Sequence, residues 1–327
     1  MRAFVVSEID DSLSLEVKDV EASGDADDVL VAIEYSGINF KDTMVAAPKS
    51  RVRRVASLVG GVDAAGTVER SSDPTLPVGT RVAVHGGALG VARDGGFAQY
   101  VYSPARYVTA LPDAISTRAA MIIGTAGFTA MESLLALEDR GLAPGAEVLV
   151  TGATGGVGSQ AVAFLAARGY DAVASTGSPS ASQWLIERGA ARVVGRDDIA
   201  DNPGRVLASE TWAGAIDCVG GDTLVQILRS LRYGGAVAAS GLVGSAELAT
   251  TVYPFITRSV ALLGIDSVEA TKETRARVWT QIGDVASRID FDGLADREVQ
   301  LEALVAALEV VRNGKTRGRI LVNPTPG

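Results

Sequence analysis

The first 110 residues alternate short apolar stretches with clusters of glycine, proline and aspartate. Apolar stretches of this length, bounded by such turn residues, are typical of β-strands that are joined by tight turns. We therefore expect this half of the chain to form an irregular β-barrel or sandwich. The pattern predicts strands at residues 3–7, 13–20, 28–36, 64–70, 80–84, 97–103 and 107–111.

The pattern changes near Pro112. Ser116 can cap a helix, and the apolar residues that follow it recur at helical spacing. Beyond residue 147, apolar strands alternate with helices, which predicts parallel strands with crossover helices in a doubly wound sheet. The expected strands are 147–151, 171–175, 192–194, 214–219, 236–241 and 260–265, with helices at 156–168, 181–188 and 224–231.

The end of the chain carries two further helical patterns, at 273–287 and 301–312, and a last strand at 319–322. In a two-domain interpretation these elements return to the first domain. We therefore expect a first domain at 1–115, a second domain at 116–265, and a return to the first domain at 266–327.

Composition narrows the class of protein. The 327 residues hold 30 Lys and Arg against 39 Asp and Glu, a net charge of −9 that argues against nucleic acid as the main partner. The single cysteine, Cys218, cannot form an internal disulfide, and the single histidine, His85, leaves little for a metal site. We expect a cytoplasmic protein, and the pattern shows neither a leader peptide nor a membrane span.

The most specific local signal is a glycine-rich loop between an apolar strand and a helix. Glycines here let the backbone turn tightly and approach a pyrophosphate at the start of the helix, which predicts dinucleotide binding. A turn kept only for close packing is the alternative, and a Walker loop is excluded because no Gly-Lys-Ser/Thr follows. The loop reads Val148-Leu-Val-Thr-Gly152-Ala-Thr-Gly155-Gly156-Val-Gly158-Ser159.

The tip of the next strand bears on which dinucleotide is bound. NAD sites usually place a carboxylate there for the ribose 2′-hydroxyl, whereas this tip reads Ser175-Thr176-Gly177-Ser178. An uncharged tip tolerates a 2′-phosphate, so we expect NADPH. Arg196 is the candidate cation for that phosphate, with an ordinary surface arginine as the alternative.

Motifs along nearly the whole chain resemble those of the medium-chain dehydrogenase/reductase superfamily, and within it the acrylyl-CoA reductase branch of the zinc-independent quinone oxidoreductases. The resemblance implies a GroES-like β-barrel catalytic domain and a Rossmann domain with a doubly wound parallel sheet. Besides the glycine loop, the motifs are Gly37-Ile-Asn-Phe-Lys-Asp42, Gly61-Val-Asp-Ala-Ala-Gly-Thr67, Gly95-Gly-Phe-Ala-Gln99, Gly124-Thr-Ala-Gly-Phe-Thr-Ala130, Trp212-Ala-Gly-Ala-Ile-Asp217, Tyr233-Gly-Gly235, Pro254-Phe-Ile256 and Gly264-Ile-Asp-Ser-Val268.

Zinc-dependent relatives carry a cysteine and a Gly-His-Glu where this chain holds Asn39 and Gly61-Val62-Asp63. Asn39 and Val62 offer neither thiolate nor imidazole, so we expect no metal and exclude oxidation through a zinc alkoxide. Hydride transfer from a nicotinamide to an activated C=C or to a quinone remains. There the substrate's own carbonyl takes up the negative charge, and hydrogen-bond donors can stabilise it.

The resemblance implies that the loop of residues 39–42 faces the nicotinamide. Asn39 is expected to donate its amide to an enolate oxygen, and Lys41 to act as electrophile or proton donor; alternatively, both only shape the loop. Phe40 replaces a tyrosine common in the family, which removes that phenol as a proton donor but keeps a cofactor contact.

The remaining cofactor contacts are also carried over from the family, although Ser178 stands where a basic residue is usual. The resemblance implies three groups of cofactor contacts. The first is Thr125 with the glycine loop, the second lies at the adenosine end, and the third lines the nicotinamide side. The residues are Thr125, Gly155, Gly156, Val157 and Gly158; then Thr176, Gly177, Ser178 and Arg196; then Leu242, Ile256, Ser267 and Asn313.

Four cations lie together in the segment 48–55: Lys49, Arg51, Arg53 and Arg54. They are interpreted either as a site for the phosphates of a CoA thioester or as a solvated loop.

Three functional hypotheses follow: a reductase of short 2-enoyl-CoA thioesters such as acrylyl-CoA, a quinone reductase, and a nicotinamide-binding protein without catalysis. The first two act on a small molecule. The strand 260–265 is expected at a sheet edge, and the resemblance implies that two copies pair along this edge as a homodimer.

Overall fold

The computed structural model describes residues 1–201 and 205–325. The chain forms two compact units. The first comprises Met1–Ala126, Ser267–Ala286 and Phe291–Gly327, and the second comprises Gly127–Asp266 and Ser287–Asp290.

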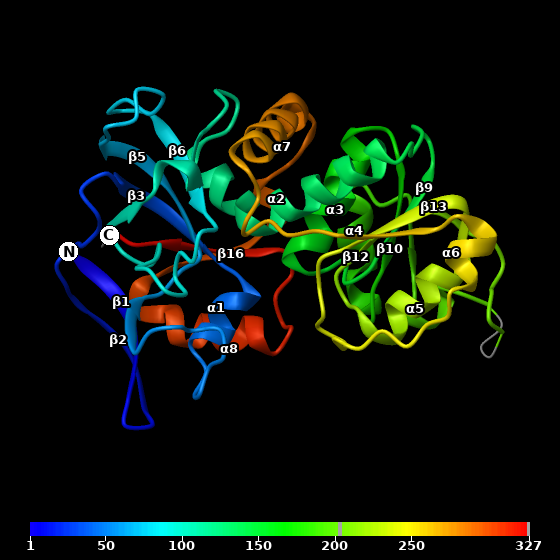
Figure 1. The fold of residues 1–327 in the computed structure, drawn as a ribbon, viewed down its shortest axis with the longest axis horizontal. Helices are drawn as coiled ribbons and strands as arrows, with labels where there is room; N and C mark the ends of the chain where they lie inside the picture. Colours follow the sequence, from blue (N-terminus) through cyan, green and yellow to red (C-terminus); the bar gives the residue numbers. More distant parts are fainter. Residues whose placement is uncertain (202–204, 326–327) are drawn as a thin grey trace. The chain divides into compact units, whose positions relative to one another are not determined.

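The first unit is built on two β-sheets (Figure 1), as its turn-rich pattern predicts. The smaller sheet has the order β2 (Ser12–Asp19), β1 (Arg2–Ile9), β4 (Ser57–Val59). The larger has the order β15 (Ala295–Gln300), β16 (Arg319–Asn323), β3 (Val29–Ile38), β5 (Asp63–Arg70), β6 (Arg81–His85), β8 (Val108–Ala110), and β7 (Tyr100–Ser103) pairs with β3.

The seven strands expected in the first 110 residues are all present, with ends that differ by a few residues. The last strand, β16, returns from the C-terminus and pairs antiparallel with β3, so that Ile320 lies opposite Ile38. The strands β4 and β15 were not expected. Both are short or charged, and they form because a neighbouring strand offers an edge.

Three helices complete the first unit: α1 (Phe40–Val45), α7 (Lys272–Val285) and α8 (Leu304–Arg312). The sequence predicts the last two, but not α1. Arg312 ties the end of α8 to α1, because its Nη2 donates to the Thr43 carbonyl at 3.0 Å. Short 3-10 turns lie in this unit at Ala105–Tyr107, Asp292–Leu294 and Leu301–Ala303, and another, Ala286–Arg288, begins in the first unit and ends in the second.

The helix α2 (Thr117–Asp139) begins in the first unit and continues into the second. Gly124 interrupts it with φ 51° and ψ −161°, a conformation that favours glycine. By length and composition alone α2 could cross a membrane. However, 83% of its most apolar stretch is buried inside the fold.

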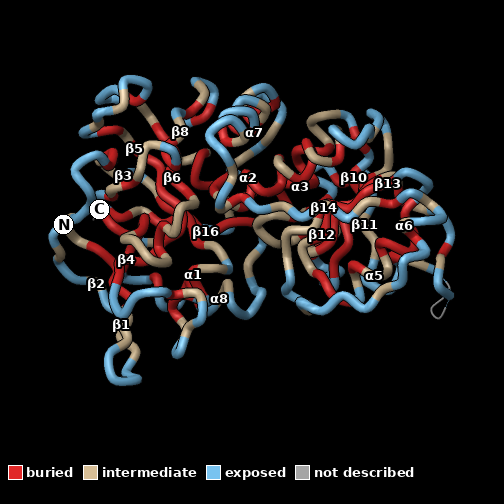
Figure 2. The backbone as a smooth tube through the Cα atoms, in the orientation of Figure 1, coloured by how far each residue is buried: buried red, intermediate tan, exposed pale blue. Residues whose placement is uncertain are grey.

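The second unit is a six-stranded parallel sheet with helices, the doubly wound arrangement that the alternating pattern predicts. Its central strands are buried (Figure 2), and the expected strand 260–265 lies at the edge as β14. The strand order is β11 (Arg192–Val194), β10 (Asp171–Ser175), β9 (Glu147–Val150), β12 (Trp212–Asp217), β13 (Leu231–Ala239), β14 (Ala261–Gly264). The helices are α3 (Gly156–Ala167), α4 (Ser182–Glu187), α5 (Gly221–Ser230) and α6 (Tyr253–Arg258), with 3-10 turns at Pro179–Ala181 and Arg196–Asp198.

Candidate functional site

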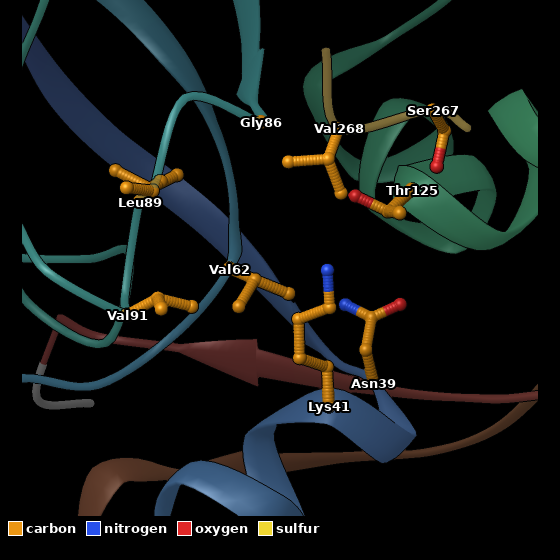
Figure 3. A pocket seen from close by; sticks show the side chains of 10 residues that line it. Asn39, Lys41, Val62, Gly86, Leu89, Val91, Thr125, Ser267 and Val268 are labelled. Atoms are coloured by element: carbon orange, nitrogen blue, oxygen red, sulfur yellow. The ribbon is translucent and has the colours of Figure 1, made fainter. Parts of the chain in front are cut away.

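A pocket in the first unit brings together residues that are far apart in the sequence (Figure 3). Four of the predicted site residues line it: Asn39, Lys41, Thr125 and Ser267. The remaining wall is mostly apolar and is formed by Val62, Gly86, Ala88, Leu89, Val91 and Val268. A small polar group set within an apolar wall is typical of a small-molecule site.

Lys41 carries the only charged side chain among the residues that line this pocket. Its amine lies beside the Asn39 amide and points into the pocket (Figure 3). Within the part of the chain that the structure describes, the amine makes no hydrogen bond or ion pair. It is therefore available to a substrate oxygen. Phe40, its neighbour, is not a lining residue, and its side chain is 42% exposed.

The Asn39 amide is already committed to protein groups. Its Nδ2 donates to the Asp63 carboxylate at 2.7 Å and to the Gly37 carbonyl at 3.3 Å. Its Oδ1 accepts from Arg319 at 2.9 Å. Both amide hydrogens are thus used, which argues against the expected donation to an enolate oxygen and leaves that role to Lys41.

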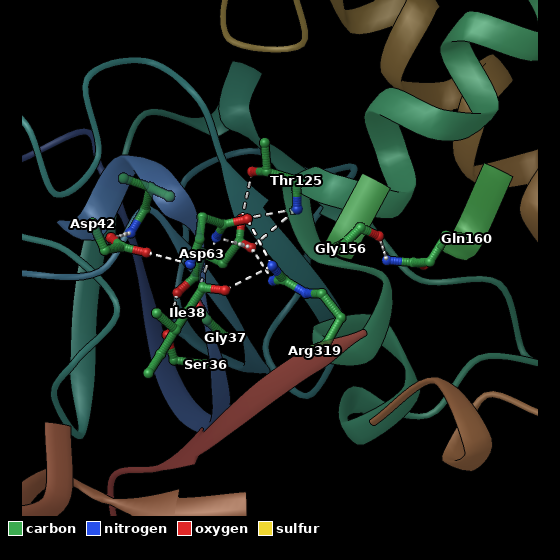
Figure 4. Close-up of polar contacts among 11 residues, drawn as sticks. Ser36, Gly37, Ile38, Asp42, Asp63, Thr125, Gly156, Gln160 and Arg319 are labelled. Atoms are coloured by element: carbon green, nitrogen blue, oxygen red, sulfur yellow. Dashed lines mark hydrogen bonds and ion pairs between the residues drawn. The ribbon is translucent and has the colours of Figure 1, made fainter. Parts of the chain in front are cut away.

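Asp63 is the centre of a buried polar network (Figure 4). Its carboxylate is fully buried and accepts from Asn39, from Nη2 of Arg319 at 3.0 Å, and from the backbone N–H of Thr125 at 3.0 Å. The Thr125 hydroxyl also donates to Oδ1, at 2.5 Å. Sequence reasoning missed Arg319. A charged residue that opens the apolar stretch Arg319-Ile-Leu-Val is the signal that could have found it.

Asp42 lies buried beside this network. Its Oδ2 accepts from the Asn39 N–H at 2.7 Å, and its Oδ1 accepts from the Val62 N–H at 3.0 Å. Burial raises the pKa of Asp42 to about 7, and the nearby charge of Asp63 acts in the same direction. The two backbone donors and Arg319 oppose that shift of the pKa without cancelling it.

Arg275 holds in place the part of the pocket wall that contains Val268. Its side chain is 1% exposed and donates to the Val268 carbonyl and to the His85 carbonyl, both at 2.9 Å. The lone histidine is therefore part of the fold. Burial and the adjacent Arg275 lower the pKa of His85 well below its ordinary value, so the ring is neutral.

The glycine loop of the second unit has the form that a pyrophosphate requires. Gly152 has φ 59°, and α3 begins at Gly156 directly after Gly155. A Cβ on Gly158 would lie 2.4 Å from the Gly152 carbonyl oxygen, so no larger residue fits there without a backbone shift. Figure 4 shows the first turn of α3, where Gln160 donates to the Gly156 carbonyl at 3.2 Å.

The predicted 2′-phosphate residues lie together at the tip of β10. The Arg196 guanidinium lies across Gly177, because a Cβ on that glycine would be 2.6 Å from its Cζ. Arg196 is exposed and has no ion-pair partner among the described residues. The Ser178 N–H donates to the Thr176 hydroxyl at 3.1 Å, which shapes the turn.

The last three predicted cofactor residues have different surroundings. Leu242 follows β13 at the carboxyl ends of the strands, which is the end that carries the glycine loop. Ile256 lies on α6, where Arg258 binds the Leu231 carbonyl at the amino end of β13, so its placement does not support the predicted contact. Asn313 is exposed at the end of α8 and does not line the pocket.

Residues 25–113 match the alcohol dehydrogenase GroES-like domain family, and residues 156–282 match the zinc-binding dehydrogenase family. The chain is 43% identical over 314 residues to the putative quinone oxidoreductase YhfP of Bacillus subtilis, covering 95% of each chain. It is 44% identical over 299 residues to the acrylyl-CoA reductase AcuI of Ruegeria pomeroyi, covering 90% of each.

These two similarities extend over nearly the whole chain and decide the family. The chain belongs to the medium-chain dehydrogenase/reductase superfamily. The structure of the YhdH oxidoreductase from Salmonella enterica in complex with NADP has a TM-score of 0.93 at 39% identity, covering 99% of this chain and 100% of that one. The YhfP structure, with NAD bound, has a TM-score of 0.93 at 42% identity, covering 99% of each chain.

A member of this superfamily with a catalytic zinc needs thiolate, imidazole or carboxylate ligands, and the residues of this pocket do not fit one. Among the described residues, no group of three or more His, Cys, Asp or Glu side chains could hold a metal ion. Asn39 and Val62 provide no such ligand, and the Asp63 carboxylate is engaged by Arg319.

NADPH, in contrast, fits the residues present. The close approach of Gly158 to Gly152 leaves backbone N–H groups at the start of α3 for a pyrophosphate. The exposed guanidinium of Arg196 and the absence of a carboxylate in Ser175–Ser178 suit a 2′-phosphate. This superfamily member is an oxidoreductase that uses NADPH.

The basic segment 48–55 divides into a buried and an exposed part. Arg53 is 8% exposed, pairs with Glu8 and donates to the Val45 carbonyl at 2.7 Å, so it supports the fold. Arg51 and Arg54 are exposed and have no ion-pair partner among the described residues. The Arg54 N–H donates to the carbonyl of Val91, a pocket-lining residue, at 2.9 Å.

Proposed function

We propose that the protein reduces the C=C bond of a short 2-enoyl-CoA thioester, acrylyl-CoA foremost, with NADPH as the reductant. The observation that carries the proposal is the Lys41 amine, which has no partner among the described residues and lies in an otherwise mostly apolar pocket. A conjugated thioester develops negative charge on its carbonyl oxygen during reduction, and a cation in an apolar site stabilises that charge strongly. The similarity to the R. pomeroyi acrylyl-CoA reductase supports this choice of substrate.

NADPH, when bound, supplies the hydride that forms the new C–H bond at the β-carbon. The π electrons of the C=C bond then shift toward the thioester carbonyl, and the α-carbon takes up one proton. Lys41 places its ammonium group at the carbonyl oxygen and is the candidate source of that proton. The apolar side chains of Val62, Leu89 and Val91 exclude water from the enolate.

The cofactor would be held by the second unit's own residues. The segment Gly155–Gly158 offers backbone N–H groups to the pyrophosphate. Thr176, Ser178 and Arg196 are placed for the adenosine 2′-phosphate. Thr125 and Ser267, on the pocket wall, are the candidates for the nicotinamide side.

Arg51 and Arg54 favour a CoA thioester over a small uncharged substrate. Their guanidinium groups are exposed, and the Arg54–Val91 hydrogen bond ties their loop to the pocket wall. The 3′-phosphate and diphosphate of CoA are ligands that arginines bind well. Charge reversal at both positions should raise the KM for the thioester and leave the KM for a quinone unchanged.

Quinone reduction is the second candidate function. The similarity to the B. subtilis putative quinone oxidoreductase favours it, and the same cation at the pocket could stabilise a quinone oxygen. A quinone would make no use of Arg51 and Arg54.

We also propose that the protein forms a homodimer. The strand β14 lies at the open edge of the parallel sheet, with Leu262 37% exposed on it. Unpaired strand edges favour association, and two copies related by a two-fold axis would extend the sheet. Light scattering on the purified chain should give twice the monomer mass, and a monomer would overturn this part.

The test of the function is the initial rate of NADPH oxidation with acrylyl-CoA, measured beside a simple 1,4-quinone. A rate far higher with the thioester supports the enoyl-CoA function. Activity with the quinone but not with the thioester would show that the protein is a quinone reductase. Tight NADPH binding without turnover of either substrate would show that catalysis has been lost.

A further inference from the structure

We infer that the buried Asp63–Arg319 ion pair positions Lys41 and Thr125 in this pocket. It stands where zinc-dependent relatives hold their metal ion. The inference rests on the proposed reductase function. Asp63 is 0% exposed and Arg319 is 3% exposed, so neither touches the substrate. Their effect on catalysis would pass through the groups that they hold.

The pair clamps the residue that starts the helix carrying Lys41. Nη1 of Arg319 donates to the Ile38 carbonyl at 2.7 Å and to the Asn39 side chain at 2.9 Å. Asp63 accepts from the other end of the same amide at 2.7 Å. Asn39 immediately precedes α1, so its position sets where the second residue of that helix, Lys41, projects.

The same pair fixes the other polar side of the pocket. Asp63 binds both the N–H and the hydroxyl of Thr125, which lines the pocket. Asn39 and Thr125 are 86 positions apart in sequence, and the carboxylate of Asp63 joins them in space. A shift of the carboxylate would therefore move two walls of the pocket at once.

The backbone is shaped to admit the guanidinium. A Cβ on Gly37 would lie 2.7 Å from Nη2 of Arg319, and a Cβ on Gly124 would lie 2.6 Å from the same nitrogen. Gly124 also takes φ 51°, which breaks α2 and turns the Thr125 N–H toward Asp63. The two glycines thus leave the space that the buried Arg319 guanidinium occupies. Packing of an apolar side chain would not need glycine at both positions.

Among the described residues, Arg319 binds its partners only through its two terminal nitrogens. Its Nε is buried and makes no hydrogen bond to any residue that the structure describes. A free guanidinium ion in the cavity of Arg319→Ala could therefore replace every contact that the structure gives the side chain.

The experiment measures steady-state kinetics of Arg319→Ala with and without millimolar guanidinium chloride, with whichever acceptor the wild-type enzyme reduces. We expect kcat to fall about 10²-fold, because displacement of a reacting group by about 1 Å has that effect. The KM for NADPH should change far less than kcat, because among the proposed cofactor contacts the pair holds only Thr125. Guanidinium should restore at least a tenth of the lost rate, whereas ammonium chloride at the same concentration should not.

The matched control is Arg297→Ala, on the neighbouring strand β15, whose side chain is 47% exposed and pairs with Asp296. It should show neither loss nor rescue. Folded Arg319→Ala with wild-type kcat would overturn the inference, and so would a loss that guanidinium leaves unchanged. If Arg319→Ala does not fold, the isosteric Asp63→Asn variant replaces it, and a wild-type kcat there would equally overturn the inference.

A second measurement separates this inference from the proposed function. Competitive acylation, followed by peptide mapping, reports the relative reactivity of the Lys41 amine in wild type and variant and needs no substrate turnover. We expect Arg319→Ala to change the labelling of Lys41 at least threefold, and Lys315 to keep its labelling. If the wild type reduces no acceptor, the proposed function fails, and unchanged Lys41 labelling would then overturn the positioning role separately.

Discussion

The glycine loop and the Asp63 network are two polar sites of this chain that are built in opposite ways. The loop consists of backbone groups from consecutive residues, Gly152–Gly158, at the junction of β9 and α3. The network consists of side chains from Asn39, Asp63, Thr125 and Arg319, which come from four distant segments. The glycine loop is formed by neighbouring residues in the sequence, whereas the Asp63 network forms only when the first unit has folded.

The two constructions tolerate change differently. A backbone cradle depends on the absence of side chains, so any Cβ in the wrong place obstructs it. A buried ion pair depends on each member, because removing one leaves an uncompensated charge. Variants at each site should therefore fail in different observables: cofactor affinity for the loop, and turnover for the pocket above the network.

The largest effect is expected at the pocket. Lys41→Met should lower kcat about 10²–10³-fold, the loss seen when one donor to a developing oxyanion is removed. The dissociation constant for NADPH should change less than about twofold, because the glycine loop is untouched. Steady-state rates and fluorescence titration with NADPH give the two values. Lys18→Met, at an exposed residue of β2, is the control. A kcat close to that of wild type would show that Lys41 has no part in the mechanism. The proposed contrast between turnover at the pocket and cofactor affinity at the loop would then fail.

The reverse outcome is expected at the loop. In Gly158→Val the new Cβ would lie 2.4 Å from the Gly152 carbonyl, so the cradle must shift. We expect NADPH affinity to fall about 10²-fold, while kcat extrapolated to saturating cofactor stays within about fivefold of wild type. Gly264→Ala, where no atom lies within 4 Å of the new Cβ, is the control. Unaltered NADPH binding in Gly158→Val would mean that the cradle does not hold the pyrophosphate.

The same contrast explains what could be predicted from the sequence. The parallel sheet and the glycine loop depend on periodicity and on neighbouring residues, so β10 and β11 were predicted with their observed ends. The network depends on which buried charges meet. Asp63 interrupts an apolar stretch and Arg319 opens one. The rule that buried charges pair indicates that each needs a partner, but not which one. The break at Gly124 likewise follows from tertiary contacts, because local periodicity favours an uninterrupted helix there.

Arg196 tests the side-chain part of the cofactor site. Arg196→Met should weaken NADPH binding about tenfold or more and leave NADH binding unchanged, since one charge-assisted hydrogen bond to the 2′-phosphate is lost. Arg192→Met, an exposed arginine on the adjacent β11 that pairs with Glu147, should change neither. Equal losses for both cofactors would show that Arg196 shapes the turn at Gly177 and does not read the phosphate.

The smallest effect is expected behind the network, in the pH dependence of stability. The pKa of Asp42 is raised to about 7 in the folded chain from an ordinary value of 3.8. Between these values the unfolded chain releases a proton that the folded chain keeps, so this group lowers the free energy of unfolding as pH rises from about 4 to 7, by at most about 1.4 kcal/mol per pH unit. Below that window both states are protonated, and above it the loss is constant.

Asp42→Asn should remove that slope, although it keeps only one of the two acceptors for the N–H groups of Asn39 and Val62 and is therefore less stable overall. Urea unfolding at a series of pH values, with the variant curve subtracted from the wild-type curve, isolates Asp42 from other groups such as His85. Asp113→Asn, at an exposed carboxylate, should leave the wild-type slope intact. A difference curve that stays flat between pH 4 and 7, or rises with pH, would show that Asp42 is ionised in the folded chain, with its two backbone donors and Arg319 compensating its burial beside Asp63.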